Sequence, residues 1–238
     1  MSEFRFESTI TGAEELPVDT VRERAYGAVR VTADWRDRGV VLRVTGDVDR
    51  RDAPAFVELF FHDIFLLLNL AAPGSFDGTI TTSGGELRVR QLTFSARIFA
   101  NAGGNRLPLE SVAKWYDSLQ LGTRQLAATP EAIALFELLH LARNDEDDEQ
   151  SILRLARAAE ALLGRPESLR RLFELRDDIA RGRTPVIHPL HDDALDPRVE
   201  DATREWIEVA DAAAAQVIRA LQGIITGSAS PPCSPPAP

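Results

Sequence analysis

The residues best able to do chemistry in this 238-residue chain lie between positions 172 and 188, where a predicted helix ends in a loop. Arg176 comes seven residues after Leu169, in the middle of a stripe of apolar residues with helical spacing. A guanidinium on a core-facing position costs free energy unless an acid pairs with it. Glu160, at the edge of the apolar stripe of the preceding predicted helix, is the best partner that the sequence offers. Arg176 is therefore expected to pair two helices, to hold a phosphate, or to do both.

Two histidines follow in the loop, His188 and His191, with a proline between them and two aspartates after them. An imidazole can act as a general acid or base near neutral pH, and His188 is the candidate nearest to Arg176. The same pair is also part of a metal-binding pattern, but no third ligand accompanies it with certainty. The sequence therefore predicts a solvated loop, with no metal and no cofactor.

Composition restricts the partners that the chain could have. The formal net charge is −10, which argues against binding nucleic acid or an anionic membrane over the whole surface but leaves room for a local basic region. The single cysteine, Cys233, excludes a disulfide within the chain. The first residues lack the apolar core of a signal peptide, so we expect a cytoplasmic protein that does not enter the membrane.

The first part of the chain, residues 1–105, has the pattern of a β-rich α/β module. Phe4 and Phe6 alternate with charged residues, which is typical of a strand. The segment Phe56–Ala72 is strongly apolar and is expected to be a buried helix, with Asp52 as its capping residue. The other expected strands cover residues 28–35, 40–45, 78–82 and 86–99.

After residue 105 the pattern becomes helical as far as residue 226. Thr129 and Pro130 form a strong helix start, and the helix that follows is apolar almost all round, as expected for a central helix. Residues 227–238 are rich in Pro and Ser and are expected to be disordered. The predicted class is therefore α+β, and the expected helices cover residues 109–119, 130–142, 151–163, 166–180 and 196–224.

Two short motifs in the second part resemble the HEPN family, in particular the Apea-like HEPN proteins. The motifs are Ala-Ala-Glu-Ala-Leu-Leu at 158–163 and Leu-Arg-Asp-Asp-Ile-Ala-Arg-Gly at 175–182, with a long helix after them. The resemblance covers about residues 108–226. It implies an all-α helical bundle that pairs as a homodimer, with its motifs facing one another across a two-fold cleft.

In that family an arginine and the polar residue after it precede a histidine by four to six positions. Arg176 and Asp177 match the first two positions, while Arg181 stands where the histidine belongs. Arginine can hold a phosphate but cannot exchange a proton near neutral pH. His188 follows Arg181 after six intervening residues and Arg183 after four, so either arginine satisfies the bare spacing.

The resemblance implies a protein of a bacterial defence or toxin-type system that acts on RNA. As a metal-independent endoribonuclease, it would hold the scissile phosphate with Arg176, orient it with Asp177 and use His188 as acid or base. The alternative is a catalytically silent module for binding or dimerisation that senses RNA, a nucleotide or a partner protein such as an antitoxin. In a third possibility, the helices simply support the N-terminal module.

Overall fold

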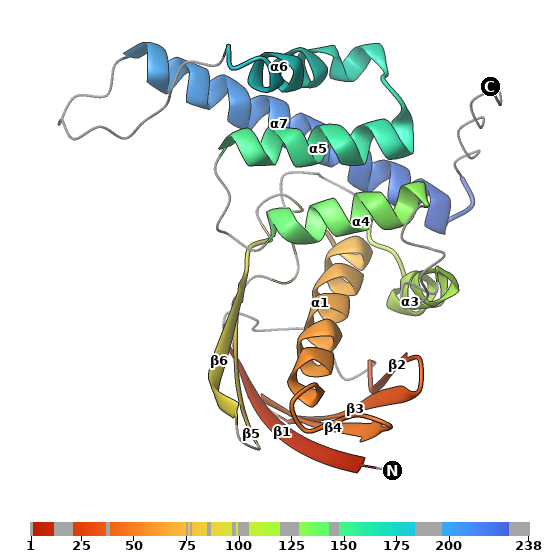
Figure 1. The fold of residues 1–238 in the computed structure, drawn as a ribbon. Coiled ribbons are helices and arrows are strands. Elements are labelled where there is room, and N and C mark those ends of the chain that lie inside the picture. The colour runs from red at the N-terminus through yellow and green to blue at the C-terminus, as the bar shows by residue number, and fades with distance from the viewer. Residues whose placement is uncertain are drawn as a thin grey trace.

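The fold is α+β, with an antiparallel sheet formed by the N-terminal part of the chain and a helical layer formed by the rest (Figure 1). The structure is a computed structural model. It describes residues 2–11, 21–36, 39–74, 76, 78–84, 87–96, 99, 105–119, 129–142, 148–183 and 197–228.

The sheet has six strands, and every neighbouring pair is antiparallel. In chain order they are β1 (Ser2–Thr11), β2 (Glu23–Tyr26), β3 (Val29–Arg36), β4 (Gly39–Gly46), β5 (Gly78–Gly84) and β6 (Leu87–Phe94). Their order across the sheet is β2-β3-β4-β1-β5-β6. Phe6 of β1 lies opposite Leu42 of β4, and both side chains are buried. Glu7 and Arg43, on neighbouring positions of the same strands, are exposed, so one face of the sheet is apolar and the other polar.

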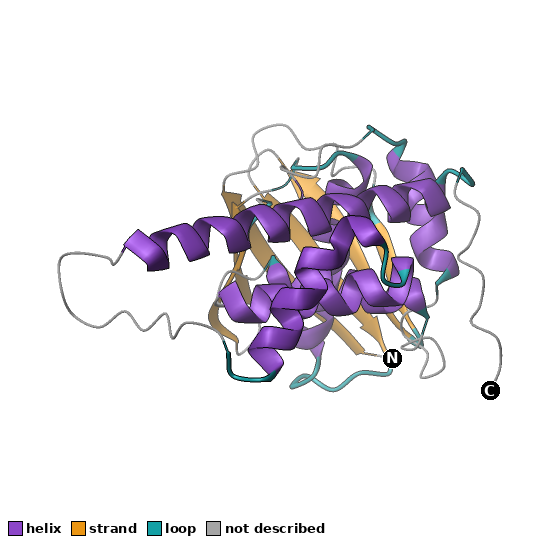
Figure 2. Cartoon of the chain, turned by 90° about the horizontal axis from the view of Figure 1, so that it is seen from above, coloured by secondary structure: helices purple, strands orange, loops and turns teal. Residues whose placement is uncertain are grey.

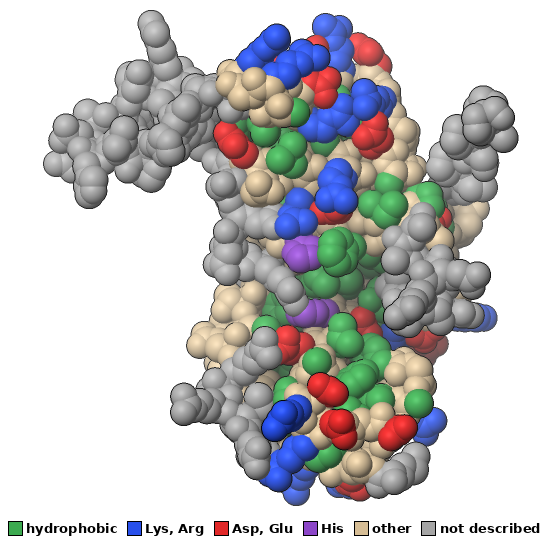
Figure 3. Space-filling model, viewed as in Figure 1, with side chains coloured by type: hydrophobic (Ala, Val, Ile, Leu, Met, Phe, Trp, Pro, Cys, Tyr) green, Lys and Arg blue, Asp and Glu red, His purple; other side chains and the backbone are tan. Residues whose placement is uncertain are grey.

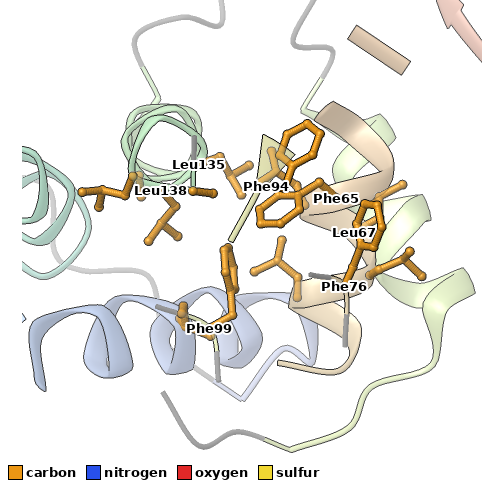
Figure 4. Packing of buried hydrophobic residues seen from close by; sticks show 14 of the residues in the cluster. Phe65, Leu67, Phe76, Phe94, Phe99, Leu135 and Leu138 are labelled. Atoms are coloured by element: carbon orange, nitrogen blue, oxygen red, sulfur yellow. The ribbon is translucent and has the colours of Figure 1, made fainter. Parts of the chain in front are cut away.

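Helix α1 (Ala53–Ala71) connects the sheet to the helical layer and is buried at every residue from Phe60 to Ala71. By length and composition it could cross a membrane, but most of it lies inside the structure. Phe65 stacks on Phe94 of β6 with ring centroids 4.8 Å apart, and Phe99 meets Phe65 edge-on at 5.5 Å (Figure 4). The predicted buried helix is confirmed.

Helix α1 packs against β3 and β4, and the helical layer lies beyond α1, on the side away from the sheet (Figure 1); Figure 2 looks down on this layer. The layer consists of α3 (Leu109–Ser118), α4 (Pro130–Leu141), α5 (Asp148–Leu163), the short 3-10 turn η2 (Glu167–Leu169), α6 (Arg170–Ala180) and α7 (Pro197–Ile225). Helix α5 packs against α4, α6 and α7. Gln222 of α7 donates hydrogen bonds of 2.9 Å to the carbonyls of Leu70 and Asn105, which attaches the last helix to the end of α1.

The buried core runs without interruption from the sheet into the helices. It includes Val31 and Leu42 of the sheet, Phe65 of α1, and Leu135 and Ile218 of the helical layer. Helix α1, which the sequence places in the first module, contacts α3, α4 and α7. The division into residues 1–105 and 106–226 stays a prediction.

The local signals predicted most elements correctly. Thr129 accepts a hydrogen bond from the Ala132 amide and caps α4 as expected. Asp52 stands at the N-cap of α1 without a hydrogen bond from its side chain. Helix α4 is not buried on all sides, because the Phe136 side chain is 57% exposed. Strand β2 was not expected, since its inward position is occupied by the charged Arg24. Residue 196 and residues 229–238 lie outside the described part of the chain.

Candidate functional site

Arg176 lies in a network of carboxylates at the contact between α5 and α6. Its Nη1 donates to Glu160 Oε2 at 2.9 Å, which confirms the predicted partner on the preceding helix. Its Nε and Nη2 both donate to Asp177 Oδ1, at 3.0 and 2.7 Å. The Arg176 side chain is 18% exposed, so these acids compensate a charge that is largely removed from water.

A second arginine completes this network. Arg165 Nε donates to Glu160 Oε1 at 2.6 Å, so one carboxylate joins two guanidinium groups. The Cζ atoms of Arg165 and Arg176 lie 5.5 and 5.4 Å from the centroid of the Phe173 ring, within the range of cation–π attraction. We call these residues the Arg176 cluster; they are Glu160, Arg165, Phe173, Arg176 and Asp177.

Asp177 is held in its charged form. The hydrogen bonds from Arg176 lower the pKa of this carboxyl, and the charges of Arg176, Arg181 and Arg165 add to the effect. A carboxylate with a lowered pKa accepts hydrogen bonds but has no proton to donate at neutral pH. Asp177 can therefore orient a guanidinium, and in its present position it would repel a phosphate.

Arg181 and Arg183 lie at the C-terminal end of α6, where Gly182 ends the helix with a φ of +63°. Both side chains are exposed, and no carboxylate of the described residues forms an ion pair with them. Arg181 occupies the C-cap position of the helix, where a positive charge also complements the helix dipole. These two residues are accessible cations next to the Arg176 cluster, and neither is engaged in an ion pair with a described carboxylate.

The histidines predicted to supply acid–base chemistry, His188 and His191, lie outside the described residues. The two histidines that the structure describes belong to other helices. His62 is buried in α1 against Phe94, and His140 of α4 packs against Phe136, in line with core or interface roles. In the described ranges, no group of three or more His, Cys, Asp or Glu side chains is arranged to bind a metal.

A second polar cluster, which the sequence did not reveal, is buried where β2, α1 and α3 meet. Asp63 of α1 accepts hydrogen bonds from Tyr116 at 2.6 Å and from Tyr26 at 2.8 Å. Arg24 Nε contacts the same carboxylate at 3.3 Å, and its Nη1 pairs with Asp117 at 2.6 Å. We call these five residues the Asp63 cluster.

Burial dominates the electrostatics of the Asp63 cluster. It raises the pKa of the Asp63 carboxyl, and Arg24 and the two tyrosine hydroxyls offset part of that rise by favouring the carboxylate. Burial and the neighbouring carboxylate raise the pKa of both Tyr26 and Tyr116. The hydroxyls therefore remain protonated donors. The arrangement is typical of a buried structural network in which each polar group has a hydrogen-bond partner.

Sequence reasoning missed this cluster because its members are distant along the chain. Arg24 and Asp63 are separated by 39 residues, and Asp63 and Tyr116 by 53. The available signal was Asp63 itself, an acid inside the apolar segment Phe56–Ala72. Such an acid requires buried donors, although the sequence does not say which residues provide them.

Comparisons of the chain with protein-family models, with curated proteins and with solved structures give no match.

Proposed function

We propose that this chain is a HEPN-like protein of a bacterial defence or toxin-type system that binds RNA at the C-terminal end of α6. The observation that carries the proposal is the pair of exposed guanidinium groups of Arg181 and Arg183, neither of which forms an ion pair with a carboxylate of the described residues. Arginine forms charge-assisted, bidentate hydrogen bonds with phosphate. The two side chains lie at the end of the helix that carries Arg176, in an otherwise acidic chain.

Binding without cleavage is the version that the contacts favour. Arg176 is engaged by Glu160 and Asp177, and the residue at the expected histidine position is Arg181, which cannot exchange a proton. This is the catalytically silent form of a HEPN-like module. A metal-independent ribonuclease that uses Arg176, Asp177 and His188 is the other outcome that the experiment below separates.

The arrangement of the helices is compatible with this proposal. In the described part, α5 packs against α4, α6 and α7, so the helices that carry both motifs form one packed layer. Basic and acidic side chains share the surface at the helical end of the molecule (Figure 3). A local interface with phosphate is therefore more plausible than attraction by the net charge, which is −10.

The test measures binding of single-stranded RNA by the wild-type protein and by the double variant R181A/R183A. We expect the double variant to lose about tenfold or more in affinity, and its salt slope to be shallower by up to about 1.4, since each phosphate contact with single strands contributes about 0.7. The matched control is R30A/R43A, which removes two exposed arginines from the polar face of the sheet. Equal affinities of the two double variants would contradict the proposal.

The same samples distinguish binding from cleavage. Incubation of the RNA without metal should leave it intact if the module is silent. If the RNA is cut and R176A abolishes the cutting, the chain is a ribonuclease, and the hypothesis of binding without cleavage is wrong.

The family resemblance also leads us to propose a cytoplasmic homodimer, with RNA or an antitoxin-like protein as a further partner. Sedimentation equilibrium of the purified chain tests the dimer directly. A single species with the monomer mass of 26.2 kDa at all concentrations would contradict it.

A further inference from the structure

The carboxylate of Asp177 occupies a position among arginines that an external anion could also occupy. It accepts two hydrogen bonds from Arg176, through Nε and Nη2. These two groups form one edge of the guanidinium fork, and such an edge also recognises phosphate. The anion-binding edge of Arg176 is thus already filled from within the chain.

The Asp177 carboxylate is placed so that it can leave the guanidinium edge of Arg176 and return to it. Its side chain is 43% exposed, whereas that of Arg176 is 18% exposed, so the acid is the more accessible member of the pair. The other side of the guanidinium is fixed independently, since Nη1 donates to Glu160. Arg176 would therefore stay in place if the Asp177 side chain turned towards water.

Other positive charges surround the same carboxylate. Arg181 follows Asp177 by four residues, one turn along the end of α6, and Arg165 shares Glu160 with Arg176. The charges of Arg181 and Arg165 both help to lower the pKa of Asp177, after the hydrogen bonds from Arg176. An anion that replaced the carboxylate would accept hydrogen bonds from Arg176 and would be attracted by the charges of Arg181 and Arg165.

We propose that Arg176, Arg181 and Arg165 form a subsite for a phosphate monoester, and that the Asp177 carboxylate covers this subsite until such a group displaces it. The proposal rests on the proposed function, because the monoester would be a terminal phosphate of a bound RNA. Asp177 is then a positioning residue that regulates access to Arg176, and it does not orient the scissile phosphate as the family resemblance implied.

The charge of the ligand determines which phosphate can displace the acid. An internal phosphodiester carries one negative charge, as Asp177 does, so the exchange brings little Coulombic gain. A phosphate monoester carries about 1.5 to 2 negative charges at pH 7 and has three acceptor oxygens. It therefore replaces the carboxylate with a net gain, and the subsite selects phosphorylated ends over internal positions.

The experiment compares D177A with D178A, which removes the same charge from the next residue. Asp178 forms no ion pair with Arg176 among the described residues, so D178A controls for the change in net charge. Each protein is titrated with three RNAs of one sequence, which carry a 5′-phosphate, a 3′-phosphate or no terminal phosphate. The first two RNAs distinguish which end supplies the monoester.

We expect D177A to bind at least one phosphorylated RNA about tenfold more tightly than the wild type, a change of about 1.4 kcal/mol. D178A should change this affinity by less than about threefold, or ~0.7 kcal/mol. Adding R181A, an exposed substitution that leaves the helix intact, should remove most of the gain in the D177A protein. Thermal unfolding of each variant verifies that the helical layer is intact.

Two results would overturn the proposal while leaving RNA binding in place. One is equal affinity of D177A and D178A for the phosphorylated RNAs, and the other is an equal gain for all three RNAs. If neither the wild type nor D177A binds any of the RNAs, both this subsite and the proposed function are wrong. If R181A/R183A loses RNA binding and D177A shows no gain in affinity, the subsite proposal is wrong and the proposed function stands.

Discussion

Tyr116 of α3 donates a hydrogen bond of 2.6 Å to Asp63 of α1, and this bond joins two helices that are far apart in sequence. Both residues are almost completely buried, at 6% and 7% relative exposure. The substitution Y116F keeps the ring and removes the donor, so the carboxylate loses one of its hydrogen bonds. Because a hydrogen bond to a charged group contributes about 1.5–3 kcal/mol, we expect a loss of that size in the free energy of unfolding.

Urea unfolding of wild type and Y116F measures this loss. Since Phe fills the same space as Tyr, a change in packing does not account for it. A loss below about 0.5 kcal/mol would mean that the hydroxyl finds an equal partner elsewhere, and that the bond to Asp63 is not a support of the fold.

Removing the charge of Asp63 should have a larger effect. The substitution D63N leaves the buried Arg24 without its inner carboxylate, and breaking a buried ion pair on one side costs about 3–5 kcal/mol. D117N removes the outer partner of the same arginine, but the Asp117 side chain is 61% exposed, so we expect less than about 1 kcal/mol. Equal effects of D63N and D117N in urea unfolding would contradict the role given to burial.

Elements whose signals lie within their own sequence were predicted correctly, whereas an element that depends on residues distant along the chain was missed. Strand β1 and helix α4 carry their own information, in the alternation around Phe6 and the capping of α4 by Thr129. Strand β2 has only four residues and places Arg24 towards the core. That orientation becomes reasonable only once Asp63, 39 residues later, is brought beside it.

The same distinction holds for the candidate site. The pairing of Arg176 with Glu160 could be predicted because helical spacing places Arg176 in the apolar stripe of one helix and Glu160 at the edge of the stripe of the preceding helix. The bond from Arg176 to its neighbour Asp177 could not, because it depends on side-chain rotamers rather than on helical spacing. The contribution of Arg165 also depends on the turn after Gly164, where φ is +71°.

A second buried acid, Glu137, gives a matched test on the contact between α4 and α5. Glu137 is 1% exposed and pairs with Arg154 at 2.9 Å and with Arg157 at 3.1 Å. The Arg154 side chain is 21% exposed and that of Arg157 is 68% exposed. We expect R154A to cost about 2–3 kcal/mol, as for loss of a charged partner from a buried acid, and R157A less than about 1 kcal/mol.

Urea unfolding of the two variants provides the measurement, and each variant serves as the control for the other because both remove one arginine from the same helix. The reverse order of effects would show that exposure does not govern the strength of these pairs. Helix propensity favours neither variant, since both introduce alanine at an internal position of α5.

The two tyrosines of the chain make the Asp63 cluster visible by absorbance, because Tyr26 and Tyr116 are the only tyrosines present. Burial and the neighbouring Asp63 carboxylate raise the pKa of both hydroxyls in the folded protein. In the unfolded chain they should titrate at about pH 10. The folded state therefore holds more protons above that pH, and its stability is complete below pH 10 and falls as the pH rises further.

We expect the tyrosinate band to stay absent in the native protein past pH 10 and then to appear together with loss of helical circular dichroism. The urea-unfolded chain should titrate smoothly near pH 10, and Y26F should make the decrease in stability with pH less steep. A native protein whose tyrosinate band develops near pH 10 with its helices intact would show that the two hydroxyls do not hold their hydrogen bonds to Asp63.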